Sequence, residues 1–160
     1  MDYFQGVVTE YLRANRAVFV NTECLINLDE GDKQLKDRHW YCDAMAINLK
    51  EGAVYLCEIT YSSTMHSLLS RLHAWEGNWQ ALRHAVLRDS GAPQTWTVQP
   101  WIFIPKRHHQ IFAKKLAKKM PAVGAEVQMP SPRITYLESV LPWEYRITWD
   151  RKTDAIAGDA

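Results

Sequence analysis

Two acidic residues lie in the middle of consecutive apolar segments. The segment YCDAMAINL carries Asp43, the segment AVYLCEITY carries Glu58, and the polar residues KEG separate the two. A carboxylate inside an apolar strand costs free energy unless it is paired, protonated or bound to a cation. These two residues are therefore the first candidates for chemistry.

A hairpin would place the two carboxylates next to each other. The apolar runs predict strands over 40–49 and 53–61, and KEG suits the turn between them. Counted back from the turn, Asp43 and Glu58 both lie about eight residues from its centre, so they pair across the strands. Two neighbouring carboxylates repel each other, and they either share a proton or bind a cation. We expect a hard divalent cation such as Mg²⁺, because it prefers oxygen ligands.

The remaining segments predict the elements that position this pair. Apolar periodicity predicts helices over 2–14, from the capping residues 62–64 to Gly91, and over 107–120. Further strands are predicted over 17–28, 95–105 and 133–140, and Pro100 suggests an edge position or a bulge in the second of these. The order α-β-β-β-α-β-α-β predicts an α/β fold with a single mixed β-sheet flanked by helices.

Length and composition limit the classes of protein. The 160 residues suit one domain, which we place at 1–150, with a flexible tail over 151–160 and a charged, mobile loop over 29–39. No apolar run is long enough to span a bilayer, so no membrane partner is expected. The three cysteines have no paired spacing, which predicts a reducing, cytoplasmic location.

The formal net charge of +1 requires any nucleic-acid surface to be local. One dense basic segment is present, and it contains Arg107, Lys114, Lys115, Lys118 and Lys119. No acid lies among the four lysines, so this segment suits a surface that follows a phosphate backbone. A solvated helix face explains the same pattern. The six histidines lack the spacing of a zinc site.

The order of elements and the acids resemble the PD-(D/E)xK nuclease superfamily, named for an Asp on one strand and a Glu-x-Lys on the next. In FQGVVTEYL, Gly6 is followed four residues later by Glu10, which is similar to the first helix of resolvase-like members. The resemblance implies a restriction-endonuclease-like fold and cleavage of nucleic-acid phosphodiester bonds with Mg²⁺ or Mn²⁺. DNA is the first candidate substrate, and a homodimer is a further implication.

The resemblance also assigns roles. It implies that Glu10, Asp43, Glu58 and the backbone carbonyl of Ile59 hold the metal. Thr60 stands at the position of the family lysine. Arg71 on the following helix is then the nearest group able to supply a positive charge, with Lys50 as a weaker candidate. The basic segment would bind the nucleic-acid backbone.

Other interpretations remain open at this point. Glu10 also reads as a solvated helix residue, and Glu23 in NTECL is a rival for its role. Thr60 favours a catalytically inactive nuclease-like fold that binds nucleic acid or protein. A third interpretation is an unrelated α+β binding protein with the acids exposed at strand ends.

Overall fold

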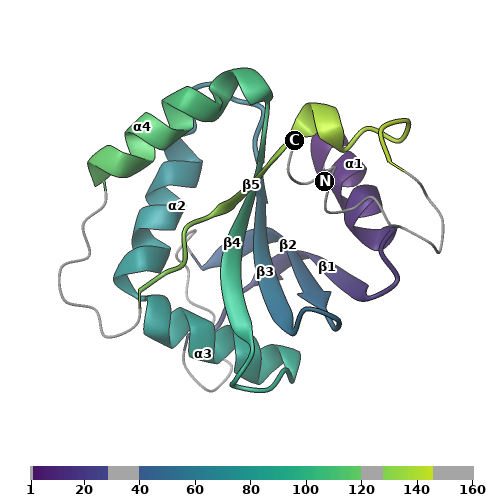
Figure 1. The fold of residues 1–160 in the computed structure, drawn as a ribbon. Coiled ribbons are helices and arrows are strands. Elements are labelled where there is room, and N and C mark those ends of the chain that lie inside the picture. The colour runs from purple at the N-terminus through teal and green to yellow at the C-terminus, as the bar shows by residue number, and fades with distance from the viewer. Residues whose placement is uncertain (1, 29–39, 120–127, 146–160) are drawn as a thin grey trace.

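The computed structural model describes residues 2–28, 40–119 and 128–145 (Figure 1). The segments predicted as a mobile loop (29–39) and a flexible tail (151–160) lie outside the described residues. Within the described residues, no helix combines the length and the apolar character needed to cross a membrane.

A five-stranded mixed sheet forms the centre of the fold. Its strands are β1 (Val18–Leu25), β2 (Tyr41–Asn48), β3 (Ala53–Ile59), β4 (Thr97–Ile104) and β5 (Arg133–Tyr136), and they lie side by side in that order. β1, β2 and β3 pair antiparallel, whereas β4 runs parallel to both β3 and β5. The predicted mixed α/β sheet is confirmed, and its order is consistent with a restriction-endonuclease-like arrangement.

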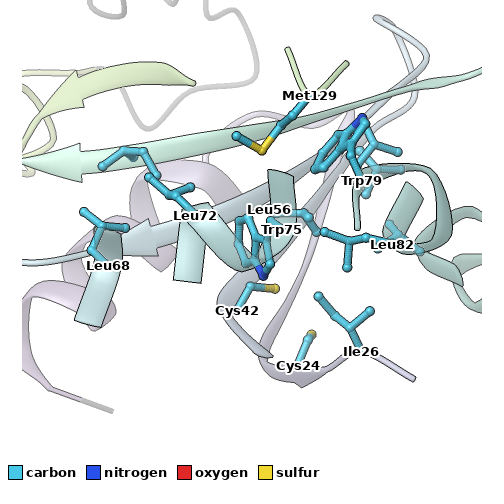
Figure 2. Packing of buried hydrophobic residues seen from close by; sticks show 14 of the residues in the cluster. Cys24, Ile26, Cys42, Leu56, Leu68, Leu72, Trp75, Trp79, Leu82 and Met129 are labelled. Carbon is cyan, nitrogen blue, oxygen red and sulfur yellow. The ribbon is translucent and has the colours of Figure 1, made fainter. Parts of the chain in front are cut away.

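Helices cover both faces of this sheet (Figure 1). The helices α2 (His66–Gly77), α3 (Trp79–Ser90) and α4 (His109–Lys119) lie on one side, and α1 (Tyr3–Arg13) lies on the other. Two apolar cores result, one under each layer. Figure 2 shows the first core, in which Trp75 and Trp79 from the helices pack with Leu56 of the sheet. Both tryptophans are buried.

The crossover through α2 and α3 explains why β3 is buried along its whole length. Parallel neighbours such as β3 and β4 require a crossing connection, and here that connection is helical and covers one face. α1 packs on the opposite face, and every residue of β3 is buried. Glu58 therefore lies in a strand that is covered on both sides.

The predicted helix ending at Gly91 is two helices. α2 ends at Gly77 and α3 begins at Trp79, because Asn78 leaves the helical conformation with φ −129° and donates its side-chain amide to the Ala74 carbonyl at 2.9 Å. The predicted stop at Gly91 is confirmed by its φ of +74°. The predicted caps at 62–64 are wrong, since α2 begins after Met65.

Two further boundaries and the position of Pro100 differ from the prediction. The strand expected over 133–140 ends at Tyr136 and continues as a 3₁₀ turn, Leu137–Ser139. The helix expected from 107 begins with a 3₁₀ turn, Lys106–His108. Pro100 lies in an interior strand, but the ladder with β5 starts only at Trp101, one residue after the proline.

The helix break generates a stability prediction. A Cβ added at Gly77 meets no atom within 4 Å, so Gly77→Ala is expected to raise the free energy of unfolding by about 0.5–1 kcal/mol through helix propensity. Gly91→Ala is the matched control, and its φ of +74° predicts a loss of about 1 kcal/mol. Urea denaturation measures both changes. If Gly77→Ala lowered the free energy of unfolding as much as Gly91→Ala does, the break between α2 and α3 would depend on Gly77 itself.

Candidate functional site

Asp43 and Glu58 lie directly beyond the last pair of the β2–β3 ladder. Ala44 pairs with Cys57, so the next residue in each strand brings these two acids opposite each other, as the hairpin predicted. The strands are joined here by a side chain, because the Ile59 N–H donates to Oδ2 of Asp43 at 2.8 Å. The carboxyl groups of Asp43 and Glu58 are close enough to hydrogen-bond to each other.

The first turn of α1 holds Asp43 from the other side. Gln5 donates its side-chain amide to Oδ1 of Asp43 at 3.2 Å. Gln5 is itself fixed by a reciprocal capping box with Asp2, in which each side chain bonds to the other backbone N–H. Both oxygens of Asp43 therefore have a defined direction before any ligand binds.

Glu58 is the most deeply buried acid of the site, with 2% of its surface exposed. Burial raises its pKa well above the usual range, and the adjacent Asp43 raises it further. Arg71 of α2 forms an ion pair with Glu58 and opposes these effects. The site thus contains two carboxyl groups, Asp43 and Glu58, and one positive side chain, Arg71.

Tyr41 contacts Arg71 next to the pocket. The guanidinium carbon of Arg71 lies 5.1 Å from the centre of the Tyr41 ring, within the range of a cation–π contact. Burial, and then the charges of Asp43, Glu23 and Glu58, raise the pKa of Tyr41 to about 12. The phenol therefore stays protonated at neutral pH.

A pocket of about 230 Å³ opens in front of the two acids. Its other walls are hydroxyl-bearing residues and the first turn of α2, namely Thr60, Ser62, Thr64, His66, Ser67 and Leu68. Met65, the N-cap residue of α2, makes no capping bond through its side chain and adopts φ +50°. The pocket thus combines two acids with Arg71, hydroxyl groups and the positive end of a helix dipole.

The structure does not bring Glu10 to this pocket. Its side chain is 72% exposed and lies 3.9 Å from Arg13. Gln5 faces Asp43, and Glu10, five residues further along the helix, projects about 140° away around the helix axis. The expected cluster of three acids is therefore not assembled, and no group of three His, Cys, Asp or Glu suited to a metal occurs in the described parts of the chain.

Glu23, the rival of Glu10, lies closer but faces elsewhere. The register Thr22↔Ala44 and Cys24↔Cys42 places Glu23 opposite Asp43, with an unusual φ of +52°. Its exposed side chain lines a separate hollow along β1. Its charge reaches the site, because it helps to raise the pKa of Tyr41.

The other predicted residues fall into two groups. Thr60, Ile59 and Arg71 line the pocket, whereas Lys50 lies in the β2–β3 turn at the opposite end of the strands. Lys115 reaches the rim of the pocket, because its Nζ donates to the Thr64 carbonyl at 3.2 Å.

The rest of the basic segment differs in position. Lys114 and Lys118 are exposed on α4, and Arg107 lies on the 3₁₀ turn before it, over the ring of Tyr61. The side chain of Lys119 lies outside the described residues.

Sequence reasoning missed Gln5, Ser62 and Thr64, which line the pocket, and Tyr41, which contacts Arg71. Gln5 carried one indication, since Asp2-x-x-Gln5 predicts a capped helix start and hence a fixed side chain. The hydroxyls were interpreted as helix caps, but the left-handed Met65 starts the helix later and leaves Ser62 and Thr64 on the pocket wall. Tyr41 carried no indication of its role.

No protein-family model matches this chain, and no curated protein matches it. Among solved structures, the fold is similar to the crystal structure of an XisH family protein from Nostoc punctiforme PCC 73102. That likeness has a TM-score of 0.45 and 16% sequence identity, and it covers 88% of this chain and 95% of the other.

A divalent cation fits the two-acid part of the expected site. The raised pKa of Glu58 shows that Asp43 and burial leave its negative charge unfavourable, and a cation between the two acids would remove that cost. Two carboxylates and the Ile59 carbonyl are oxygen ligands of the type that Mg²⁺ takes, with water completing its shell. The residues present therefore fit a two-carboxylate cation site and not the three-carboxylate site expected.

The buried acid generates a pH prediction. The native state keeps a proton on Glu58 at pH values where the unfolded chain has released it, above about 4.3. Stability in the absence of metal should therefore fall as pH rises from that value through the native pKa. Glu58→Gln, which keeps a group that accepts from Arg71, should remove this fall and raise the melting temperature at pH 7–8 by a few degrees.

Thermal melts between pH 4 and 8 in EDTA measure this effect. Glu10→Gln is the matched control and should follow the wild-type curve, because Glu10 is exposed. A Glu58→Gln protein that is less stable than wild type at every pH would mean that the ion pair with Arg71 outweighs burial and repulsion.

Proposed function

We propose that the chain is a metal-dependent nuclease that cleaves phosphodiester bonds at the pocket of Asp43 and Glu58. One observation carries the proposal: two adjacent carboxylates share a pocket with Arg71 and the uncapped first turn of α2. The carboxylates suit a cation, and the guanidinium and helix end suit an anion. Cation-assisted cleavage of a phosphate ester needs both at one place.

Each residue has a task in this proposal. Asp43, Glu58 and the Ile59 carbonyl would hold Mg²⁺ or Mn²⁺, which when bound supplies Lewis-acid activation of the phosphodiester and of the attacking water. The Ile59 N–H and Gln5 fix the direction of Asp43. Glu58 must release its proton to bind a cation, so metal affinity should rise with pH.

Arg71 supplies the positive charge that a lysine at position 60 would carry and that Thr60 does not. A guanidinium stays protonated, so it stabilises negative charge developing on a phosphate but does not act as a base. Its contact with Tyr41 and its ion pair with Glu58 hold it at the inner wall of the pocket. Thr60 supplies a hydroxyl that can orient water or a phosphate oxygen.

The second candidate function is a binding module with this fold and no catalysis. Two observations favour it: Arg71 already compensates Glu58, and the raised pKa of Glu58 favours the protonated form, which is a poor metal ligand. In that case nucleic acid or a protein would occupy the same surface without being cut. Homodimer formation and a cytoplasmic location stay predictions under both functions.

A cleavage assay separates these functions. Labelled single-stranded and duplex DNA and RNA are incubated with Mg²⁺, Mn²⁺ or EDTA. We expect metal-dependent cleavage that falls by about 100-fold or more in Asp43→Asn and in Arg71→Ala. Glu10→Gln should keep the wild-type rate, because its side chain faces away from the pocket.

The opposite result is equally specific. Cleavage that persists in Asp43→Asn would mean that the activity arises elsewhere. Binding of nucleic acid without cleavage under any metal condition would establish the second candidate.

A further inference from the structure

A group of exposed aromatic side chains lies beside the pocket and has no task in the mechanism above. Tyr3 and Tyr61 are 68% and 51% exposed, and Phe4 lies between them. We call Tyr3, Phe4, Tyr61 and Arg107 the rim cluster. The members contact one another in that order.

The rim cluster is stacked. The rings of Phe4 and Tyr61 are parallel within 6°, with centres 4.8 Å apart, and Tyr3 meets Phe4 edge-on at 5.3 Å. The guanidinium carbon of Arg107 lies 4.9 Å from the centre of the Tyr61 ring. Side chains that hold each other in this way lose little conformational freedom when a flat ligand joins the stack.

The cluster is continuous with the pocket. Gln5, directly after Phe4, lines the pocket, and so do Thr60 and Ser62 on either side of Tyr61. Arg107 reaches the same place because β3 and β4 run parallel and end together, with Ile59 beside Phe103. Ligands of open α/β sheets bind beyond the carboxyl ends of such strands.

Three basic side chains lie at the rim, where the nearby acids are Asp2, which caps α1, and Glu138, which accepts from the Lys106 N–H. Lys106 and Arg107 are exposed on the 3₁₀ turn, and Lys115 lies at the carbonyl of Thr64. Flat aromatic and guanidinium groups interleaved with cations are the surface that unpaired nucleobases and their phosphates require. A paired base cannot use such a surface, because its faces are already stacked inside the duplex.

We infer that the rim cluster binds an unpaired nucleobase at its Arg107 end, so that the pocket receives single-stranded or locally unpaired nucleic acid. This inference rests on the proposed function for the reaction that follows, but the binding step itself needs neither metal nor cleavage. In this arrangement the base joins the stack over the guanidinium. The adjoining phosphate then lies toward Arg71 and the first turn of α2.

Fluorescence anisotropy tests the binding step. A labelled oligonucleotide of about 12 nucleotides, single-stranded or annealed to its complement, is titrated with the 160-residue chain in EDTA. Wild type should bind the single strand more tightly than the duplex. Tyr61→Ala should weaken single-strand binding by at least about fivefold, and Tyr61→Phe should stay within about twofold of wild type.

Arg107 separates stacking from charge. Arg107→Lys keeps the charge but loses the planar group, so affinity should fall by at least about threefold while the salt dependence is unchanged. Arg107→Ala should in addition reduce the slope of log K against log salt by about 0.7. Phe19→Ala is the matched control, because Phe19 is an exposed aromatic residue on β1 outside the pocket, and it should bind as wild type.

Three results would overturn the inference: equal affinity for single strand and duplex, wild-type affinity in both Tyr61→Ala and Arg107→Lys, or no binding of any oligonucleotide. In the last case, a protein partner would be the remaining candidate ligand of the rim cluster. Failure here is distinguishable from failure of the proposed function. Binding that depends on the rim cluster without any cleavage rejects only the nuclease, and metal-dependent cleavage with no effect of Tyr61→Ala rejects only this inference.

Discussion

The repulsion between Asp43 and Glu58 is the constraint on which the rest of the site depends. The two acids meet where the β2–β3 ladder ends, and Glu58 lies in β3, which is buried along its whole length. Water cannot screen Glu58 at 2% exposure, so its charge must be met by a proton, by Arg71 or by a bound cation. Each of these three states gives the pocket a different chemistry.

The surrounding elements position the groups that compensate the charge of Glu58. α1 contributes Gln5, which orients Asp43, and α2 contributes both Arg71 and a first turn that is open toward the pocket. Arg71 forms an ion pair with Glu58. In the proposed reaction, a metal bound by the carboxylates would leave the guanidinium of Arg71 available to a phosphate. The same residue thereby connects the resting protein with the proposed reaction.

The sequence predicted the sheet and the pairing of the two acids because both follow from local patterns. Two apolar runs joined by a short turn fix the register of a hairpin, and the register fixes which residues are opposite each other. The sequence did not predict correctly where Glu10 lies. The spacing of a Gly and a Glu does not specify how a helix is rotated over a sheet, and Gln5 faces the site instead. The prediction also failed at Met65, since a left-handed residue before a helix left no recognisable pattern in the sequence. The rim cluster joins α1, the end of β3 and the turn after β4, and no local pattern connects these segments.

Calorimetric titration of Mg²⁺ and Mn²⁺ into the metal-free protein, in buffers of different ionisation enthalpy, tests the central claim most directly. Because Glu58 must lose its proton to bind a cation, we expect binding below the native pKa of Glu58 to be accompanied by proton release, seen as a heat that varies with the buffer. Asp43→Asn should abolish both, and Glu10→Gln should change neither. Absence of binding in wild type, or equal binding in Asp43→Asn, would contradict the claim that these two acids form a cation site.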